Sequence, residues 1–274
     1  MERRKFLASS LAASALAIGK GEALLQGAQV AQTGQPGDST KTREFYVLDR
    51  YRLASGPQRR LTDGYLRDAL IPALNRAGIS PVGVFNVSIG PETPVTYVLM
   101  SSQSLETLVT VERRLAQDAD YVKAAAPFLN APATAPAFVR MESSLMQAFE
   151  NTRLTLPAAT AAKSPRIFEL RTYESLSDQD HKRKVEMMTL HEGEIFAKAG
   201  IWPVFYGDTL IGSNLPNLTY LLGFESIAER ETKWAAFSNS PEWKSLTADP
   251  RYSFESIVSN ITNIILTPAG YSQI

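Results

Sequence analysis

The histidine best placed for chemistry in this sequence is His191. It lies four residues from both Met187 and Ile195, so on a helix it borders the apolar face. A neutral imidazole at such a border can act as a base near neutral pH, or it can ligate a metal or a haem iron. The plainer interpretation is a border histidine bonded to solvent or to a backbone carbonyl, and general grounds favour it. His191 is therefore a catalytic candidate, and the alternative is that it has a purely structural role.

A stretch of alternating residues supplies the second catalytic candidate, Arg171. Glu169, Arg171 and Tyr173 alternate with Phe168 and Leu170, so the three polar residues share one face of a strand. A guanidinium on that face can bind a carboxylate or a carbonyl oxygen, with Glu169 and Tyr173 as further pocket residues. The alternative, which ranks ahead of it, is an Arg–Glu pair within the layer between two sheets.

Aromatic residues follow on the next two expected strands. Trp202, Val204 and Tyr206 share one face of a strand by alternation, and Tyr220 stands on the strand after it. Such aromatics can line a site for a planar ligand, so Trp202, Tyr206 and Tyr220 are pocket candidates. Aromatic residues at this spacing belong more often to a core.

The sequence argues against several kinds of site. Ile195 stands where a zinc-binding helix would carry its second histidine, so no metal site is expected. The chain has no cysteine, which excludes disulfides, thiolate metal ligands and a cysteine nucleophile. Neither a glycine-rich phosphate loop nor a Gly-x-Ser-x-Gly motif occurs. Lys and Arg together number 28, as do Asp and Glu, so no net charge recruits nucleic acid. The basic run 181–184 is expected on a solvated helix face.

A repeated hexapeptide shows how the chain is organised around these candidates. The sequence AGIWPV at 199–204 matches AGISPV at 77–82, a separation of 122 residues. Other pairs keep this separation: Leu48 with Leu170, Tyr51 with Tyr173, and Tyr121 with Trp243. Thr96-Tyr97 matches Thr219-Tyr220 one residue out of step, which predicts a single insertion. Both histidines and all three tryptophans lie in the second copy, so a polar pocket is expected there.

Each copy shows the same order of expected elements, βαββαβ, which is the ferredoxin-like unit. The first copy has strands at 43–53, 81–87, 94–100 and 138–149, with helices at 62–77, 104–117 and 118–125. The second has strands at 166–173, 202–209, 217–225 and 254–266, with helices at 178–199, 226–237 and from 240. Asp178 is a plausible N-cap, Pro72 predicts a kink, and Gly78 and Gly200 are expected to end their helices.

Two such units predict an α+β fold in which one chain forms a barrel. Helices cover one face of each sheet, so the bare faces must be buried, most simply against each other. The result is a single-chain pseudo-dimer with its repeats packed sheet to sheet. The expected domains are an export signal and flexible leader (1–41), a first repeat (42–153), a linker (154–165) and a second repeat (166–274).

The N-terminus is typical of a twin-arginine export signal. Arg3 and Arg4 precede Phe-Leu and an Ala/Leu-rich run that reaches about Ile18. A stable membrane span needs about 20 apolar residues, and this run is shorter and rich in alanine. The sequence therefore predicts an exported protein, periplasmic or extracellular, without a membrane span after export.

The second copy resembles the NIPSNAP family. The opening strand RIFELRTY (166–173), the segment FESIAERE (224–231) and the turn SPEW (240–243) are similar to that family's motifs. The similarity covers about 166–268 well and 43–150 in outline, so the chain resembles two tandem NIPSNAP-like repeats. The resemblance implies the dimeric α+β barrel fold. Relatives within that superfamily include cofactor-free monooxygenases and haem-handling proteins, but fold analogy alone does not transfer an activity.

These observations favour a binding or interaction module over an enzyme, because no catalytic constellation is complete. Its ligand would be small and apolar or aromatic, held in the second repeat, and no cofactor is expected. One alternative is a cofactor-independent oxidoreductase, such as a monooxygenase, or an isomerase, with His191 as base and Arg171 as oxyanion partner. Others are a haem-binding protein with His191 as axial ligand and a structural subunit that oligomerises further.

Overall fold

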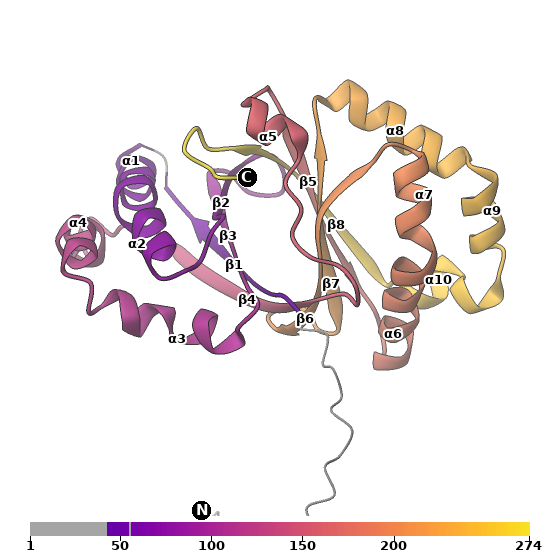
Figure 1. The fold of residues 1–274 in the computed structure, drawn as a ribbon, viewed down its shortest axis with the longest axis horizontal. Coiled ribbons are helices and arrows are strands. Elements are labelled where there is room, and N and C mark those ends of the chain that lie inside the picture. The colour runs from indigo at the N-terminus through magenta and orange to yellow at the C-terminus, as the bar shows by residue number, and fades with distance from the viewer. Residues whose placement is uncertain (1–42, 55) are drawn as a thin grey trace, which may run out of the picture. The chain divides into compact units, whose positions relative to one another are not determined.

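The fold was obtained as a computed structural model, which describes residues 43–54 and 56–274. Arg3, Arg4 and the rest of the expected export signal lie outside these residues. Within them, strands close into one antiparallel barrel in the order β1-β3-β2-β8-β5-β7-β6-β4 (Figure 1). The strands are β1 (Phe45–Arg52), β2 (Gly83–Ile89), β3 (Val95–Ser102), β4 (Arg140–Ala148), β5 (Ile167–Glu174), β6 (Trp202–Ile211), β7 (Asn217–Phe224) and β8 (Asn260–Pro268).

The barrel consists of two ferredoxin-like halves. The first half orders its strands β4-β1-β3-β2 and the second β8-β5-β7-β6, which is the same pattern. Backbone pairing joins the halves at two seams, β2 with β8 and β4 with β6. Because both sheets lose their free edges in this way, the predicted single-chain α+β barrel is confirmed.

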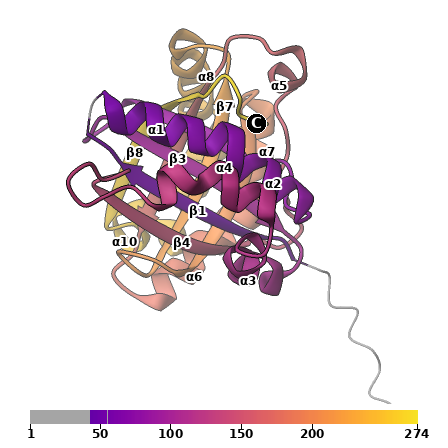
Figure 2. The same ribbon diagram turned by 90° about the vertical axis from the view of Figure 1, so that its left-hand side faces the viewer.

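Helices cover the outside of both halves (Figure 1). The first half carries α1 (Pro57–Tyr65), the π-helical turn η1 (Leu66–Leu70), α2 (Ile71–Arg76), α3 (Leu105–Leu115) and α4 (Ala119–Leu129). The short α5 (Ala158–Ala162) lies between the halves in sequence. The second half carries α6 (Asp178–Met187), the π-helical turn η2 (Met188–Glu192), α7 (Gly193–Lys198), α8 (Ile227–Asn239), α9 (Pro241–Thr247), the 3-10 turn η3 (Pro250–Tyr252) and α10 (Phe254–Ile257). Figure 2 shows α1 and α4 side by side across the first half's strands, where they are in contact.

The 122-residue separation holds through most of the fold. It relates β1 to β5, η1 to η2, α2 to α7 and β3 to β7, each with identical bounds after the shift. The insertion predicted from Thr96-Tyr97 is wrong. Tyr97 pairs with Arg50 on β1, and Thr219 pairs with the equivalent residue Thr172 on β5. Tyr97 and Thr219 are therefore the structural equivalents, and the out-of-step match is a coincidence of residue types.

Both long helices contain a π-helical turn at the same place. In the first half, Pro72 follows this turn, at the start of α2, where its missing N–H is tolerated. The second half has the same turn although Glu194 occupies the equivalent position. The proline is therefore not what produces the distortion, and the turn belongs to the architecture of each half.

Two expected boundaries differ from the structure. The N-cap of α6 is Ser177, not Asp178, because the Ser177 hydroxyl accepts a hydrogen bond from the Asp180 backbone N–H at 3.1 Å. The expected strand 254–266 begins as the helical turn α10, and β8 starts only at Asn260. Ile257 on α10 is buried in the core of the second half, so its apolar side chain reflects packing of a helical turn.

Three apolar layers hold the molecule together. The barrel interior is filled by side chains from both halves, including Tyr46, Phe85, Phe168 and Phe205. Each half has a second core between its sheet and its helices. The prediction that the bare sheet faces bury against each other is confirmed. Among the described residues, no helix combines the length and apolar character that crossing a bilayer requires.

Candidate functional site

The polar face of β5 points toward the helices of the second half. Phe168 and Leu170 lie in the barrel interior, whereas Tyr173 belongs to the core between sheet and helices. Glu169 and Arg171 share the face of Tyr173. The expected location of the Arg–Glu pair, between the two sheets, is therefore wrong, and the pair lies in the sheet–helix layer.

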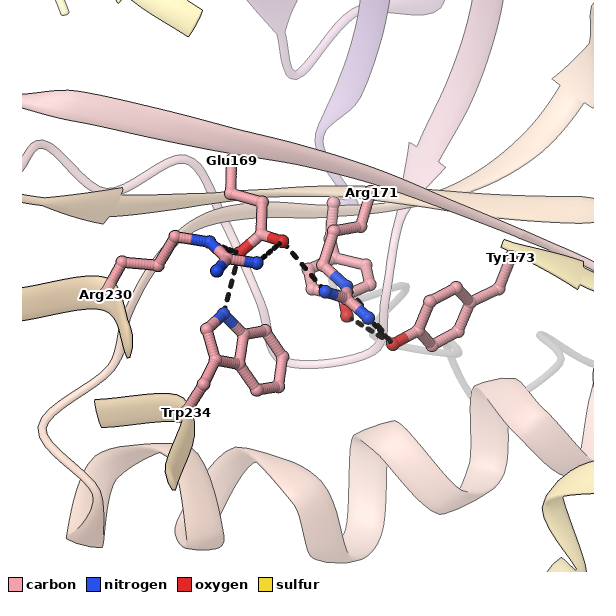
Figure 3. Close-up of polar contacts among 6 residues, drawn as sticks. Glu169, Arg171, Tyr173, Arg230 and Trp234 are labelled. Atoms are coloured by element: carbon pink, nitrogen blue, oxygen red, sulfur yellow. Dashed lines mark hydrogen bonds and ion pairs between the residues drawn. The ribbon is translucent and has the colours of Figure 1, made fainter. Parts of the chain in front are cut away.

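Glu169 is the centre of a buried ionic cluster (Figure 3). Its side chain is 0% exposed, and its carboxylate accepts four hydrogen bonds. Arg230 on α8 donates twice, through Nη2 at 2.6 Å and Nε at 3.0 Å. Trp234 Nε1 donates at 2.7 Å and Arg171 Nη1 at 2.8 Å. The carboxylate thus ties strand β5 to helix α8 and has its hydrogen-bonding capacity taken up by the protein.

Arg171 continues the cluster toward two tyrosines. Its Nη2 and Nε donate to the Tyr173 hydroxyl oxygen at 2.9 and 3.2 Å, and the Tyr220 hydroxyl donates to the same oxygen at 2.8 Å. The guanidinium also lies 4.5 Å from the centre of the Trp234 ring. The candidate residues Glu169, Arg171, Tyr173 and Tyr220 therefore lie together, with their polar groups bonded to one another.

Charge keeps Glu169 ionised despite its burial. Burial by itself raises the pKa of this carboxyl, but the Arg230 hydrogen bonds, the Arg171 charge and the Trp234 N–H outweigh it and hold the pKa below its usual range. The equivalents of Glu169 and Arg171 in the first half are Val47 and Asp49. The ionic cluster is therefore specific to the second half.

The second half contains another buried ion pair, which the sequence pattern did not predict. Lys184 on α6 is 0% exposed and donates to Glu192 of η2, which is also buried. The Lys184 ammonium lies 5.2 Å from the Tyr173 ring centre. The expectation that 181–184 form a solvated face is wrong for His181 as well, since it is buried with Nε2 2.7 Å from Asp208 Oδ1. The missed signal is spacing, because Lys184 lies at helical intervals from Met188 and Ile195.

The candidate residues of β6 do not share one face of the strand. The strand pairing shifts between Pro203 and Phe205, so the alternation of side chains breaks there. Val204 consequently faces the barrel interior and Tyr206 faces the helices, while Trp202 is 42% exposed. The expectation that these three residues share a face is wrong. Tyr206 stacks on Phe149, and its hydroxyl finds no hydrogen-bond partner among the described residues.

His191 lies on the outer side of the helical layer. It is exposed at the π-helical turn η2, and its ring meets the Tyr252 ring edge-on with the centres 5.6 Å apart. Arg171 is inside the sheet–helix core, bonded to Glu169 and Tyr173. The two catalytic candidates therefore occupy different environments.

His191 faces an open groove of about 520 Å³ between η2–α7 and α9. The groove is lined by Leu190, His191, Glu194, Ile195, Lys198, Pro241, Glu242, Ser245 and Leu246. In the first half the equivalent helix α4 packs on η1 and α1, with Tyr65 and Phe128 stacked 3.9 Å apart. In the second half α9 is shorter, seven residues against eleven, and it contacts α8 and η3. The groove thus lies between η2–α7 and α9, whereas α4 packs directly on η1 in the first half.

The charges of the groove disfavour haem. Within the part of the chain that the structure describes, no three His, Cys, Asp or Glu side chains are grouped to hold a metal. Haem carries two propionates, and the groove presents Glu194 and Glu242 with one cation, Lys198, already bonded to Glu242. Like charges would therefore oppose haem beside His191.

Comparison with known families and structures agrees with this fold. Residues 168–273 match the family model of NIPSNAP. Residues 168–273 therefore form a NIPSNAP domain. A NIPSNAP-like protein of Burkholderia xenovorans is 22% identical over 39% of this chain and 88% of its own, with a TM-score of 0.35. No curated protein matches the chain.

Over the barrel as a whole, the similarity to solved structures is one of fold alone. A proposed monooxygenase from Lactobacillus acidophilus is 8% identical, covers 82% of this chain and 94% of its own, and has a TM-score of 0.55. A proposed monooxygenase from Fusobacterium nucleatum is 7% identical, covers 82% and 92%, and has a TM-score of 0.54. Both cover most of this chain, so the two-half barrel is an architecture that those proteins share.

Proposed function

We propose that this protein is a small-molecule binding module whose ligand occupies the groove of the NIPSNAP domain. The observation that carries the proposal is the groove of about 520 Å³ beside His191, between η2–α7 and α9 of the second half. This volume lies within the range of about 300–1,000 Å³ usual for ligand pockets.

The lining suits a small ligand with an apolar or aromatic body. Leu190 is 60% exposed in the groove, and Ile195 and Leu246 add apolar surface beside it. His191 and Ser245 supply polar groups that can orient a ligand. Covering these apolar side chains provides the driving force for binding.

The enzyme alternative gains no support from the geometry. This alternative requires His191 as base and Arg171 as oxyanion partner around one substrate. Arg171 is instead committed to Glu169 and Tyr173 inside the core, while His191 faces the groove. The groove therefore combines His191 with a binding surface but not with Arg171.

The test uses N-phenyl-1-naphthylamine, a neutral aromatic probe whose fluorescence rises in apolar surroundings. We expect saturable binding to the full chain, and we expect Ser245→Trp to weaken it at least about tenfold, or about 1.4 kcal/mol, by filling the groove. Ser238→Trp is the matched control, because Ser238 is an exposed residue of α8 outside the groove.

Two results would count against the proposal. Equal binding by Ser245→Trp and Ser238→Trp would place the probe elsewhere. A visible absorption band on adding haem, lost in His191→Ala, would favour the haem-binding alternative.

We also propose that the protein is exported through its twin-arginine-type signal. The support is the sequence Arg3-Arg4 followed by Phe-Leu and a weakly apolar run. In a bacterial host with a twin-arginine translocase, we expect the full chain outside the cytoplasm and the Arg3→Lys/Arg4→Lys variant inside it. Immunoblots of cell fractions measure this, and equal export of both chains would refute the signal.

A further inference from the structure

The groove of the NIPSNAP domain carries more negative than positive charge. Two carboxylates, Glu194 and Glu242, line it, and Lys198 is its only lysine or arginine among the described lining residues. Lys198 Nζ donates to Glu242 Oε1 at 2.8 Å. That bond, with the charges of Glu242 and Glu194, raises the pKa of Lys198. One ammonium therefore balances one carboxylate, and a second carboxylate charge remains.

Glu194 is the carboxylate that remains available. It is exposed, and it makes no hydrogen bond with any other described residue. Another carboxylate close to His191, that of Glu186, is already taken, since it accepts hydrogen bonds from Arg251 and from the Tyr252 hydroxyl. Glu194 is thus the groove carboxylate without a bonded counter-ion among the described residues, although its charge also acts on Lys198.

The apolar surface of the groove lies on both sides of this charge. Leu190 and Ile195 flank Glu194 along η2 and α7, and Leu246 faces them from α9. An apolar or aromatic group can cover these side chains while a polar end of the same molecule stays at Glu194. The arrangement selects a ligand with one charged end and one apolar end.

We propose that the ligand of this groove is a small amphipathic amine, with its protonated nitrogen at Glu194 and its apolar or aromatic body on Leu190 and Leu246. The inference rests on the proposed function, since it names the ligand class of the same groove. A ligand carboxylate would meet repulsion from Glu194 and would have to displace Glu242 from Lys198. A protonated amine avoids both costs.

Three compounds that share a phenyl ring on a short chain test the sign of the charge. Phenethylamine is cationic, 2-phenylethanol is neutral and 3-phenylpropionate is anionic at neutral pH. Each is titrated against the full chain loaded with N-phenyl-1-naphthylamine, and loss of fluorescence gives its affinity. We expect phenethylamine to bind about fivefold more tightly than 2-phenylethanol, as one solvated charge pair allows, and 3-phenylpropionate to bind most weakly.

Glu194→Gln identifies the responsible group. It should lower the affinity for phenethylamine to that for 2-phenylethanol and leave the alcohol unaffected, because only the charge is removed. The matched control is Glu231→Gln on the exposed face of α8, which should keep the full preference for the amine.

The outcomes separate this inference from the proposed function. If the naphthylamine probe binds the groove but phenethylamine has no advantage, or keeps its advantage in Glu194→Gln, the amine assignment is wrong and the binding module stands. If the probe itself does not bind, both proposals are wrong.

Discussion

The Glu169→Ala variant is expected to lose about 3–5 kcal/mol in the free energy of unfolding, because it leaves buried charges without a counter-ion. Arg230 and Arg171 would lose the carboxylate that accepts three of their hydrogen bonds, and the Trp234 N–H would lose its acceptor. The pKa of Glu169 is held below its usual range in the folded state. Its stabilisation is therefore present at neutral pH and is lost only as the pH falls through that lowered pKa.

Urea unfolding followed by circular dichroism measures this loss. Val47→Ala is the matched control, because Val47 holds the equivalent position on β1 of the first half. Removal of two methyl groups there should cost only about 1–2 kcal/mol. The account of the ionic cluster would be contradicted if Glu169→Ala cost no more than Val47→Ala.

The Asp49→Asn variant is expected to be more stable than the parent at pH 7, by up to about 3 kcal/mol. Asp49 is 7% exposed, and its Oδ1 has no hydrogen-bond partner among the described residues. Burial raises the pKa of its carboxyl to about 6, helped by the charge of Glu112 and opposed by a hydrogen bond from Ser143. Folding at neutral pH thus keeps an ionised carboxylate in a site that disfavours its charge.

The sign of the pH dependence follows from that raised pKa. Between the ordinary value of 3.8 and about 6, the folded chain holds a proton that the unfolded chain has released. The contribution of Asp49 to stability therefore falls as the pH rises through this window and is constant above it. Asparagine carries no charge, so Asp49→Asn should lack this fall.

Unfolding free energies at pH 4.5 and pH 7 measure the effect. Asp120→Asn, at an exposed position of α4, is the control and should keep the pH dependence of the parent. A parallel pH dependence in Asp49→Asn and the parent would show that this carboxyl titrates normally.

Much of the fold is predictable from the sequence because the two halves of the chain share recognisable sequence repeats. The hexapeptides at 77–82 and 199–204 fix the separation, and the structure keeps it for β1 and β5, for β3 and β7, and for the two π-helical turns. Alternation on β5 also grouped Glu169, Arg171 and Tyr173 correctly. Alternation says which residues share a face, but it does not say whether that face meets the helices or the other sheet.

The remaining features depend on irregular geometry that residue patterns do not encode. The pairing shift in β6 separates Val204 from Tyr206, although their spacing places them together. The charged neighbours of Lys184 in the sequence predict a solvated run, whereas its helical spacing places it inside, where the structure has it. The groove depends on how α9 packs against α8 and η3, which only the tertiary arrangement reveals.

The proposed function places the ligand in the NIPSNAP domain, and not in the barrel interior or the first half. Methyl NMR spectra of the full chain, recorded with and without N-phenyl-1-naphthylamine, distinguish these locations. We expect shift changes at Leu190, Ile195 and Leu246, which line the groove. Changes instead at Leu48 and Val87 in the barrel interior, or at Leu70 in the first half, would contradict it.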